Sequence, residues 1–492
     1  MPGFGDECPD FGDKEIKTAL NREKKKGGVS CMGFFEETNG VLIFRENGES
    51  LQVEAWGENS LRVRSRMLGE ISEEQSALTE PVALCGAKIT IDDEYHAQIA
   101  NGKIHAELAV QAWGHALQIT FYNEKNQVLL REIPNGGALC LKARYYRSQP
   151  GGSFYLKASF LANEGEKIYG MGQYQQERMD LKGCNLELAH RNSQASVPFY
   201  VSSLGYGFLW NNPAVGEVHF GANTTEWEAW STDQLDYWIT AGGCLPEIEK
   251  NYSAVTGRAP IMPEYGLGFW QCKLRYYNQQ QVIDIAEEYH RRGIPLDVLV
   301  IDYYHWPRCG DYRFDEEYFP EPEKMVSRLH ELGVETMVSV WPQIDWRSEN
   351  YEEMKQQGLL VKSNSGIDVQ MVFHGNNVFM DATNPRTRKY VWKKCKKNYA
   401  DLGIRTFWLD EAEPEFGTYE YQTYRYYAGP VEKVGNIYPR EYAKLFYEGQ
   451  KESGQEDVVN LIRCAWAGSQ KYGALVWSGD IMSTYEDFRR QI

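Results

Sequence analysis

The sequence predicts a multidomain protein of the β plus α/β class, with an N-terminal antiparallel β-sandwich followed by a TIM-type (β/α)8 barrel. Three observations support this prediction. Residues 33–241 show a succession of short strand patterns separated by Gly, Asn and Asp, with no convincing amphipathic helix. Beyond Pro263, strand and helix patterns alternate, which is typical of parallel βα units. Polar or acidic residues end most of these later strands, and barrel enzymes carry their active sites at the carboxyl ends of their strands.

The strands of the first part are indicated by period-two alternation and by turn residues. Residues 41–44 are apolar and are followed by Asn47 and Gly48, a turn dipeptide. Residues 61–64 alternate between apolar and charged side chains, as a half-buried strand does. Further strands are expected at residues 88–91, 117–121, 199–201 and 207–211.

Two prolines, Pro260 and Pro263, mark the expected boundary between a sandwich domain at residues 1–257 and a barrel domain at residues 258–492. The expected barrel strands are residues 265–271, 297–302, 335–341, a strand that ends at Asp410, 458–463 and 474–480. The expected helices are residues 279–292, 322–331, 384–399 and 440–453.

A doubly wound sheet would show the same alternation, but the polar strand ends favour the barrel. A nucleotide-binding enzyme is disfavoured because no Gly-x-Gly-x-x-Gly or phosphate loop follows the first barrel strand. Only six barrel strands are expected, whereas a closed barrel of this type has eight. The count therefore predicts that the chain is a fragment or a truncated gene product, and leaves its activity as given in doubt.

The composition argues against several classes of partner and cofactor. The net charge of −17 and the pI near 5.2 disfavour nucleic acid and anionic membranes as partners. Residues 1–13 lack the apolar stretch of a signal peptide, and no apolar run is long enough for a membrane helix. The ten cysteines are scattered, without Cys-x-x-Cys spacing or pairing with histidine, which predicts reduced thiols, a cytoplasmic location and no metal site.

Two aspartates at strand ends indicate the chemistry. The apolar and aromatic segment 404–408 runs into Asp410, and the segment 473–479 runs into Asp480. A carboxylate pair in one α/β domain is typical of glycoside hydrolysis. The aromatic content of 13%, with 14 Trp and 32 Tyr, also fits a sugar-binding protein, because pyranose faces stack on aromatic rings. The plain alternative is that Asp480 is a loop residue and that the glutamates after Asp410 only favour a helix N-terminus.

Several distinctive motifs follow one another along the chain. In the sandwich part they are Ile-Tyr-Gly-Met-Gly-Gln-Tyr-Gln-Gln at residues 168–176, Ser-Val-Pro-Phe-Tyr at 196–200 and Gly-Tyr-Gly-Phe-Leu-Trp-Asn-Asn at 205–212. In the barrel part they are Trp-Leu-Asp at 408–410, Arg463 with Ala-Gly-Ser-Gln at 467–470, and Trp-Ser-Gly-Asp at 477–480. In their joint order and spacing these motifs resemble the glycoside hydrolase family 31 enzymes. The resemblance implies a retaining, exo-acting α-glycosidase with a β-sandwich before a (β/α)8 barrel.

The resemblance also implies roles for four residues. Asp410 matches the catalytic nucleophile and Asp480 the general acid/base, while Asp302 matches a residue that binds ring hydroxyls and Arg463 one beside the nucleophile. We expect Arg463 to hold the pKa of Asp410 low, and burial among aromatic residues to raise that of Asp480. The plain alternatives are a helix cap for Asp302 and an ordinary ion pair for Arg463. The reaction implies an oligosaccharide substrate and no cofactor.

The sugar preference is predicted from the residues after Asp302. Around Asp302, α-glucosidases of the family typically carry an Asp-Ile-Asp-Tyr arrangement, whereas this chain has Asp-Tyr-Tyr-His-Trp at residues 302–306, which resembles the α-xylosidase-like branch. A ring at Tyr303 or Tyr304 would exclude the C6 hydroxymethyl group that xylose lacks. A core or rim position is the alternative for both tyrosines. Aromatic walls for stacking on sugar, or alternatively core residues, are Trp270, Trp341 and Trp408, and no role is assigned to His305 and His374.

Other functions stay open on the sequence. An α-glucosidase and an α-transglycosylase share the same covalent intermediate, and the sequence does not separate hydrolysis from transfer. A truncated, inactive carbohydrate-binding remnant is the alternative from another class, because a Gly-Gly-rich strand end, a later histidine and the C-terminal β-domains of the family have no counterpart here. A homo-oligomer is compatible with the sequence.

Overall fold

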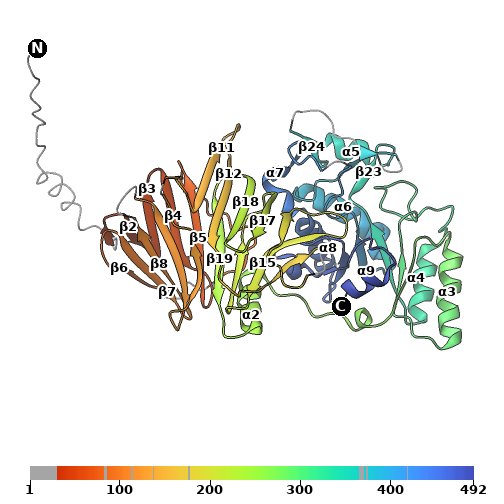
Figure 1. Ribbon diagram of the computed structural model, residues 1–492. Helices are drawn as coiled ribbons and strands as arrows, with labels where there is room; N and C mark the ends of the chain where they lie inside the picture. Colours follow the sequence, from red (N-terminus) through yellow and green to blue (C-terminus); the bar gives the residue numbers. More distant parts are fainter. Residues whose placement is uncertain are drawn as a thin grey trace, which may run out of the picture.

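The computed structural model describes residues 30–82, 86–111, 115–136, 138–175, 178–364, 371–372, 375–417 and 419–491. Figure 1 shows an elongated molecule in which the strands of the first part occupy one end, and the mixed helices and strands occupy the other. The predicted order, a β-sandwich followed by a parallel barrel-type sheet, is confirmed.

One sheet of the sandwich is formed by antiparallel neighbours within the described residues. In spatial order its strands are β1 (Ser30–Met32), β2 (Phe35–Thr38), β3 (Val41–Glu46), β4 (Glu49–Ala55), β5 (Ser60–Met67), β19 (Leu235–Ala241), β16 (Tyr206–Trp210), β15 (Ala195–Ser202) and β13 (Ile168–Gln173).

The second sheet packs against the first. Its strands are β14 (Asn185–Leu188), β17 (Gly216–Phe220), β18 (Thr224–Thr232), β12 (Phe154–Leu161), β10 (Val128–Glu132), β9 (Leu117–Asn123), β8 (Ile104–Val110), β7 (His96–Asn101) and β6 (Lys88–Ile91), with β11 (Arg144–Ser148) paired to β12. Alternate residues of both sheets, such as Leu42, Phe208, Ile119 and Phe160, meet in one continuous apolar core. The period-two pattern of the sequence thus specifies which face of each strand is buried.

A helix that the sequence analysis did not predict follows the sandwich. Helix α2 (Leu245–Thr256) begins with a proline in its first turn and buries Ile248, Tyr252 and Val255. These residues pack on Phe199 and neighbouring apolar side chains of the first sheet. Only a few apolar residues, among them Ile248, Tyr252 and Val255, are spread among polar ones, so the amphipathic period of this short helix is weak in the sequence.

The second part contains a parallel sheet, as predicted. In spatial order its six strands in the described residues are β20 (Trp270–Lys273), β21 (Val298–Ile301), β22 (Glu335–Val340), β27 (Thr406–Leu409), β30 (Asn460–Ile462) and β31 (Ala474–Val476). The connecting helices are α3 (Gln279–Arg292), α4 (Pro322–Glu331), α6 (Pro385–Asn398) and α8 (Tyr438–Glu452), and α9 (Tyr485–Arg490) follows β31.

The first barrel strand differs from its prediction. Residues Glu264–Leu267 form a 3-10 turn, η1, and the strand begins only at Trp270. The apolar and aromatic run from Tyr265 onward was interpreted as one strand, but a turn and a strand of this length give the same pattern of apolar residues.

Small antiparallel sheets are inserted between the barrel strands and were not predicted. One contains β23 (Gln343–Asp345), β26 (Asn376–Phe379) and β25 (Met371–Val372), and the other contains β24 (Lys362–Ser363), β28 (Tyr424–Tyr426) and β29 (Gly429–Pro430). The short helices are α5 (Tyr351–Gln356), α7 (Val431–Val434), η2 (Ala400–Leu402), η3 (Gly435–Ile437) and η4 (Ser469–Tyr472). Strands of two or three residues are too short to show a period in the sequence.

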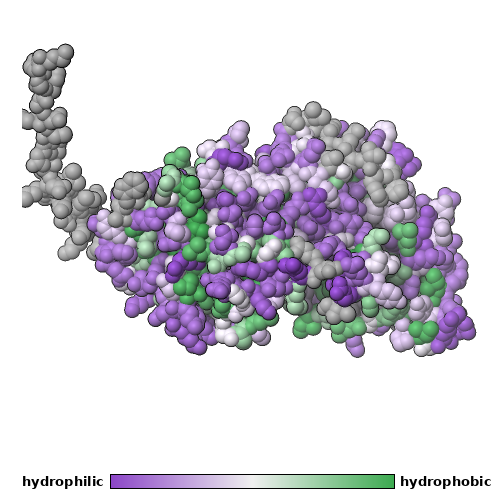
Figure 2. All heavy atoms as spheres, viewed as in Figure 1, coloured by the Kyte–Doolittle hydropathy of each residue, from purple (hydrophilic) through white to green (hydrophobic). Residues whose placement is uncertain are grey.

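The surface seen in Figure 2 is mainly hydrophilic, with hydrophobic residues in separate patches. This distribution agrees with a chain in which a quarter of the residues are charged. None of the helices in the described part of the chain has the length and apolar character that a membrane crossing requires.

Candidate active site

The side chains of the candidate site share the face of the parallel sheet that is turned away from the helices. In β21, Leu299 and Ile301 join the helix-side core, whereas Val298 and Val300 lie in a separate cluster on the opposite face. Asp302 follows directly and continues the alternation of Val298 and Val300. The same alternation directs Trp408 and then Asp410 to this face at the end of β27, because Leu409 belongs to the helix-side core.

The neighbouring strand, β30, leads to the positively charged residue of the site, Arg463. Leu461 of β30 lies in the inner cluster, and Arg463 follows it with its side chain only 3% exposed. The N–H of Arg463 donates to the carbonyl of Leu409 at 3.4 Å, and the N–H of Asp410 donates to the carbonyl of Val340 at 3.1 Å. These two hydrogen bonds continue the pairing of the parallel strands up to the site, and they hold the backbones of Asp410 and Arg463 side by side.

The guanidinium of Arg463 is the centre of the site. Its contacts are Asp410 Oδ1 at 3.4 Å, Glu411 Oε1 at 3.4 Å, Glu413 Oε1 at 2.8 Å, Glu415 Oε2 at 2.5 Å and Asp480 Oδ2 at 3.8 Å. Asp410 and Asp480 contact the same Nη1 atom. The separation of their two nearest oxygens therefore cannot exceed about 7 Å, which is compatible with the roughly 5 to 5.5 Å of a retaining carboxyl pair.

The expected electrostatics of Asp410 are corrected by the structure. Burial raises the pKa of Asp410 above its ordinary value, and the charge of Arg463 opposes this rise without reversing it. The prediction that Arg463 would hold this pKa low is therefore wrong, because the loss of solvent outweighs the single nearby cation. For Arg463 itself, burial lowers the pKa, but the surrounding carboxylates raise it well above the ordinary value.

The glutamates after Asp410 bind Arg463 rather than start a helix. Glu411 and Glu413 are buried, and the next helix along the described chain begins only at Val431. Burial raises the pKa of Glu411 to about 9 and that of Glu413 to about 7. The helix N-terminus interpretation of these glutamates is therefore wrong.

Asp302 lies on the inner face beside the pair. Its Oδ1 atom accepts a hydrogen bond from the N–H of Tyr303 at 2.7 Å. Burial raises the pKa of Asp302 to about 7, and the charges of Asp410 and Asp480 add to that rise. The charges of Asp410 and Asp480 therefore act on Asp302.

Aromatic residues border the carboxylates. The rings of Tyr303 and Tyr304 have centroids 4.0 Å apart, and Tyr303 lies 4.8 Å from Trp341. Tyr304 has a φ of +71°, a strained conformation for a residue with a side chain, and the Arg275 guanidinium lies 4.9 Å from its ring. All three rings line a hollow of about 170 Å³ together with Trp306, Asp345 and Asn377.

The other aromatic predictions are placed differently. Trp408 is partly buried in the inner cluster below Asp410 and lies 5.3 Å from the ring of Trp477. Trp270 lies at the first residue of β20, at the opposite end of the strand from the carboxylates, and packs in the inner cluster. Its position there indicates a core residue rather than a wall of the site.

His305 does not contact the carboxylates through its ring nitrogens. His305 is buried, with Nδ1 2.9 Å from the carbonyl of Asp302 and Nε2 3.0 Å from the hydroxyl of Tyr399, and burial lowers its pKa to about 4. It therefore supports the loop behind Asp302 as a neutral side chain. His374 lies outside the described residues.

Asp480 differs from its expectation. It follows β31, but its side chain is 76% exposed, so the expected burial among aromatic residues is wrong. The cause is its place in an open loop after Trp477, on the edge of the described sheet. A residue that the sequence analysis missed, Asn192 in the sandwich, donates a hydrogen bond to Asp480 Oδ2 at 2.6 Å.

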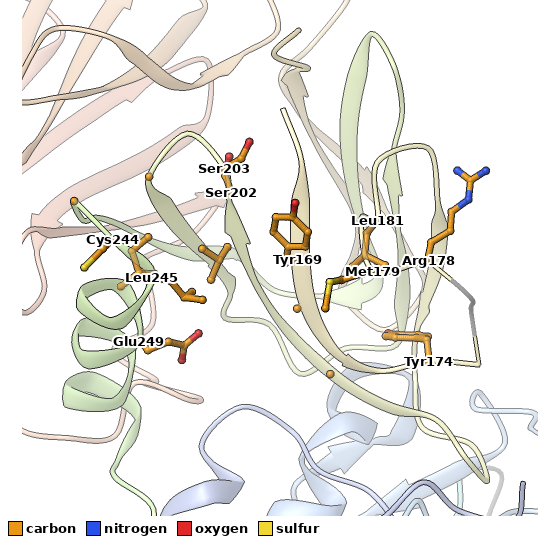
Figure 3. Close-up of a pocket in the computed structure, with 16 residues that line it drawn as sticks. Tyr169, Tyr174, Arg178, Met179, Leu181, Ser202, Ser203, Cys244, Leu245 and Glu249 are labelled. Carbon is orange, nitrogen blue, oxygen red and sulfur yellow. The ribbon is translucent and has the colours of Figure 1, made fainter. Parts of the chain in front are cut away.

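A larger hollow lies elsewhere on the molecule. A groove of about 760 Å³ on the sandwich runs between helix α2 and the residues around Tyr169 and Met179 (Figure 3). Among its lining residues only Glu249 carries a carboxylate, so it lacks the paired groups that glycoside hydrolysis requires. Within the described ranges, no group of three or more His, Cys, Asp or Glu residues is arranged to hold a metal ion.

Comparisons with known proteins show the family to which the chain belongs. Residues 259–492 match the model of the glycosyl hydrolases family 31 TIM-barrel domain, and residues 50–218 match that of the glycosyl hydrolase 31 N-terminal galactose mutarotase-like domain. The chain is 48% identical over 469 residues to an uncharacterized family 31 glucosidase of Pseudescherichia vulneris, covering 92% of this chain and 87% of that protein. The chain belongs to glycoside hydrolase family 31, which confirms the resemblance stated from its motifs.

Two further relatives carry the name α-xylosidase. Alpha-xylosidase A of Aspergillus niger is 36% identical over 374 residues, and the match covers 71% of this chain and 51% of that protein. A crystal structure of a GH31 α-xylosidase from a soil metagenome, complexed with xylose, has a TM-score of 0.90 and 50% identity, covering 93% of this chain and 69% of that chain. The matched part thus spans about half of the curated Aspergillus relative.

Proposed function

We propose that this protein is a retaining, exo-acting α-xylosidase that releases α-linked xylose from the non-reducing ends of oligosaccharides. Asp410 acts as the nucleophile, and Asp480 acts as the general acid/base. The observation that carries the proposal is the contact of both carboxylates with one Nη1 atom of Arg463, at 3.4 Å and 3.8 Å. The reaction needs two carboxyl groups on opposite sides of one bond, and no cofactor.

The two steps assign a task to each group. In the first step Asp410 attacks the anomeric carbon while Asp480 gives its proton to the departing oxygen, which forms a covalent xylosyl–enzyme intermediate. In the second step Asp480 takes a proton from water, which attacks the same carbon and releases Asp410. Arg463 stabilises the ionised form of Asp410 between turnovers, against the effect of burial. Asp302 binds sugar hydroxyls beside the reacting carbon.

The preference for xylose rests on the aromatic residues after β21. Tyr303, Tyr304 and Trp341 are packed against one another, so a C6 hydroxymethyl group could enter their space only if rings moved. Xylose lacks that group and avoids the cost. The soil-metagenome relative that is complexed with xylose supports this preference.

An α-glucosidase of the same family is the second candidate. The relative from Pseudescherichia vulneris is named a glucosidase, and its identity of 48% is similar to that of the soil-metagenome α-xylosidase. Transfer of the xylosyl unit to a sugar hydroxyl would use the same intermediate and differ only in the acceptor.

Two further predictions complete the proposal. The division of the chain at residues 257 and 258 follows the two prolines after α2, and we keep it as the proposed domain boundary. A cytoplasmic location is supported by the cysteines whose side chains are described, which are all free thiols.

The test compares release of 4-nitrophenol from the α-xyloside and the α-glucoside by the 492-residue chain. We expect the xyloside to be the better substrate. Asp410→Ala should lower xyloside turnover by about a thousandfold or more, because the attacking group is lost.

Asp401→Ala is the matched control, since Asp401 is an exposed aspartate that pairs with Lys396 and not with Arg463. It should leave turnover within about twofold of the unaltered chain. A faster glucoside reaction would replace the xylosidase proposal by the glucosidase alternative. Retention of xyloside turnover in Asp410→Ala would contradict the assignment of the nucleophile.

A further inference from the structure

A loop of the β-sandwich reaches into the candidate site. The loop joins β14 to β15 and is closed by two backbone hydrogen bonds, from Arg191 N–H to Gln194 O at 3.2 Å and from Gln194 N–H to Arg191 O at 2.8 Å. Between them Ser193 has a φ of +65°, which turns the chain tightly. Gln194 Nε2 donates to the carbonyl of Ala189 at 2.9 Å and closes the base of the loop.

Two residues of the barrel, Cys464 and Gly479, hold this loop against the barrel. The thiol of Cys464, directly after Arg463, lies 3.7 Å from Arg191 O and 3.4 Å from Gln194 O. Gly479, directly before Asp480, packs so closely on Ser193 that an added Cβ would lie 2.5 Å from its Oγ atom. The loop tip is therefore held by the residues adjacent to Arg463 and Asp480.

Asn192 occupies the tip and makes two hydrogen bonds to Asp480. Its Nδ2 donates to Asp480 Oδ2 at 2.6 Å, and its Oδ1 accepts from the Asp480 backbone N–H at 3.2 Å. One orientation of the amide satisfies both bonds, because the amino group meets the carboxylate and the carbonyl meets the N–H. The side chain of Asp480 is otherwise 76% exposed and lies 3.8 Å from Arg463.

We infer that Asn192 is a positioning residue for Asp480, which it holds with Oδ1 directed to the glycosidic oxygen. The inference rests on the proposed function. Because Nδ2 donates to Oδ2, the transferable proton belongs on Oδ1 of Asp480. In the first step this proton moves from Oδ1 to the departing oxygen as the glycosidic bond breaks, and in the second step Oδ1 receives a proton from water. The hydrogen bond from Asn192 is kept throughout.

The physical need for such a residue follows from exposure. An exposed aspartate samples several rotamers, and a proton donor must lie within hydrogen-bond reach of the departing oxygen to act on it. A contact of 3.8 Å to Arg463 fixes the side chain poorly. The bond from Asn192 Nδ2 at 2.6 Å restricts its rotamers, because the Asn192 amide is itself anchored on the Asp480 backbone N–H. The sandwich thus supplies part of the catalytic apparatus of the barrel.

The experiment uses leaving groups that differ in their need for an acid. It measures kcat/KM of the 492-residue chain on α-xylosyl fluoride, whose leaving group needs little protonation, and on an alkyl α-xyloside, whose leaving group needs it fully. kcat/KM reports only the first step, in which Asp480 is the donor. Asn192→Ala should lower the value for the alkyl xyloside by about tenfold to a hundredfold and leave that for the fluoride within about threefold.

The control is Gln194→Ala, which removes a hydrogen bond inside the same loop but none to Asp480. Gln194→Ala should change kcat/KM for both substrates by the same factor. If Asn192→Ala does not fold, Asn192→Asp provides the test, because it has the same size and replaces the donor by a second carboxylate. Asn192→Asp should lower kcat/KM for the alkyl xyloside, relative to that for the fluoride, by at least as much as Asn192→Ala does.

The outcomes separate the two proposals. Turnover of both substrates by the unaltered chain, with an equal loss or no loss in Asn192→Ala, would overturn the positioning role and leave the xylosidase proposal standing. An unaltered chain that turns over neither substrate would overturn the proposed function, and the role of Asn192 with it.

Discussion

Glu411 is the most unusual residue of the site. It is buried, its backbone has a φ of +54°, and its carboxyl is held by Gln343 Nε2 at 3.1 Å and by Arg463. Asn377 in turn donates to Gln343 at 2.9 Å. Burial raises the pKa of Glu411 to about 9, so this group keeps its proton at neutral pH. A protonated Glu411 reduces the negative charge that Arg463 must balance.

This state predicts a pH-dependent effect of Glu411→Gln. In the unfolded chain the pKa of Glu411 is near 4.5, so between about pH 4.5 and pH 9 folding must take up a proton. The contribution of Glu411 to the stability of the folded protein is fully present below the unfolded pKa and is lost as pH rises through the folded pKa. A neutral glutamine avoids this loss. The free energy of unfolding of the variant relative to the unaltered chain should therefore increase from pH 5 to pH 9, by at least about 1 kcal/mol.

Urea unfolding at a series of pH values measures this difference. Glu352→Gln on α5 is the control, because Glu352 is exposed, and its difference from the unaltered chain should stay constant across the series. A constant difference for Glu411→Gln as well would show that Glu411 is ionised in the folded protein at neutral pH.

The sequence predicted which residues of the site lie together better than it predicted their solvent exposure and pKa. Asp302, Asp410, Arg463 and Asp480 were expected together, and the structure brings them together, while their chemical roles stay predictions. The direction of the pKa shift of Asp410 and the exposure of Asp480 were misjudged, because solvent access depends on neighbours from distant parts of the chain. Asn192 was missed for the same reason, since it is 288 positions from Asp480.

At the scale of elements, helices α6 and α8 show how a single residue sets the packing distance. Gly449 lies on the buried face of α8, and an added Cβ would stand 2.2 Å from the ring of Trp392 on α6. Trp392 also contacts Phe407 of β27, the strand that leads to Asp410. The close approach of the two helices thus supports the strand behind the site.

Gly449→Ala should therefore destabilise the protein. In an open helix the same change stabilises by about 1 kcal/mol, but here the methyl group would displace Trp392, at a cost of about 1 to 3 kcal/mol. Chemical denaturation measures the change, and Glu448→Ala is the control, since Glu448 is the exposed neighbour. Its effect should not exceed about 0.5 kcal/mol. An increase in stability for Gly449→Ala would mean that the helices can separate without cost.

Two predicted helices with clear end signals, α3 and α6, have bounds within one residue of the prediction. Helix α3 begins after Asn278, whose side chain accepts from Gln281 N–H, and ends at Gly293 in a left-handed conformation. Helix α6 begins at a proline after Asn384, which caps it. Helix α2, the 3-10 turn η1 and the inserted strands lacked such signals or a sufficient length, and these were missed.

At the scale of the whole molecule, Asn436 joins the sandwich to the barrel. Its Nδ2 atom donates to the carbonyls of Leu188 and Ala214, both at 2.9 Å. Its own carbonyl lies 3.0 Å from Nε2 of His190, whose Nδ1 accepts from Ser196 N–H. Burial lowers the pKa of His190 to about 4, so this junction contains a neutral imidazole. The junction therefore carries no ionised side chain among these residues at neutral pH.

Asn436→Ala should weaken the whole molecule. Two buried carbonyls would lose their donors, which costs about 2 to 4 kcal/mol. Because the lost bonds connect the two parts, calorimetry should show the transitions of sandwich and barrel moving apart. Asn398→Ala is the control, since Asn398 donates to Tyr312 O within the barrel. It should destabilise without separating the transitions, and a single unshifted transition for Asn436→Ala would contradict the role of the junction.

The sequence by itself determined the order of the architecture, the period of each sheet and the strand ends that carry Asp302, Asp410 and Arg463. These features depend on local alternation, capping and turn residues, which act within a few positions of the chain. Only the tertiary structure decided that Arg463 gathers five carboxyl groups, that Asp480 is exposed, and that Asn192 of the sandwich contacts it. Such properties depend on which distant segments meet and on how much solvent they exclude, and no local pattern encodes either.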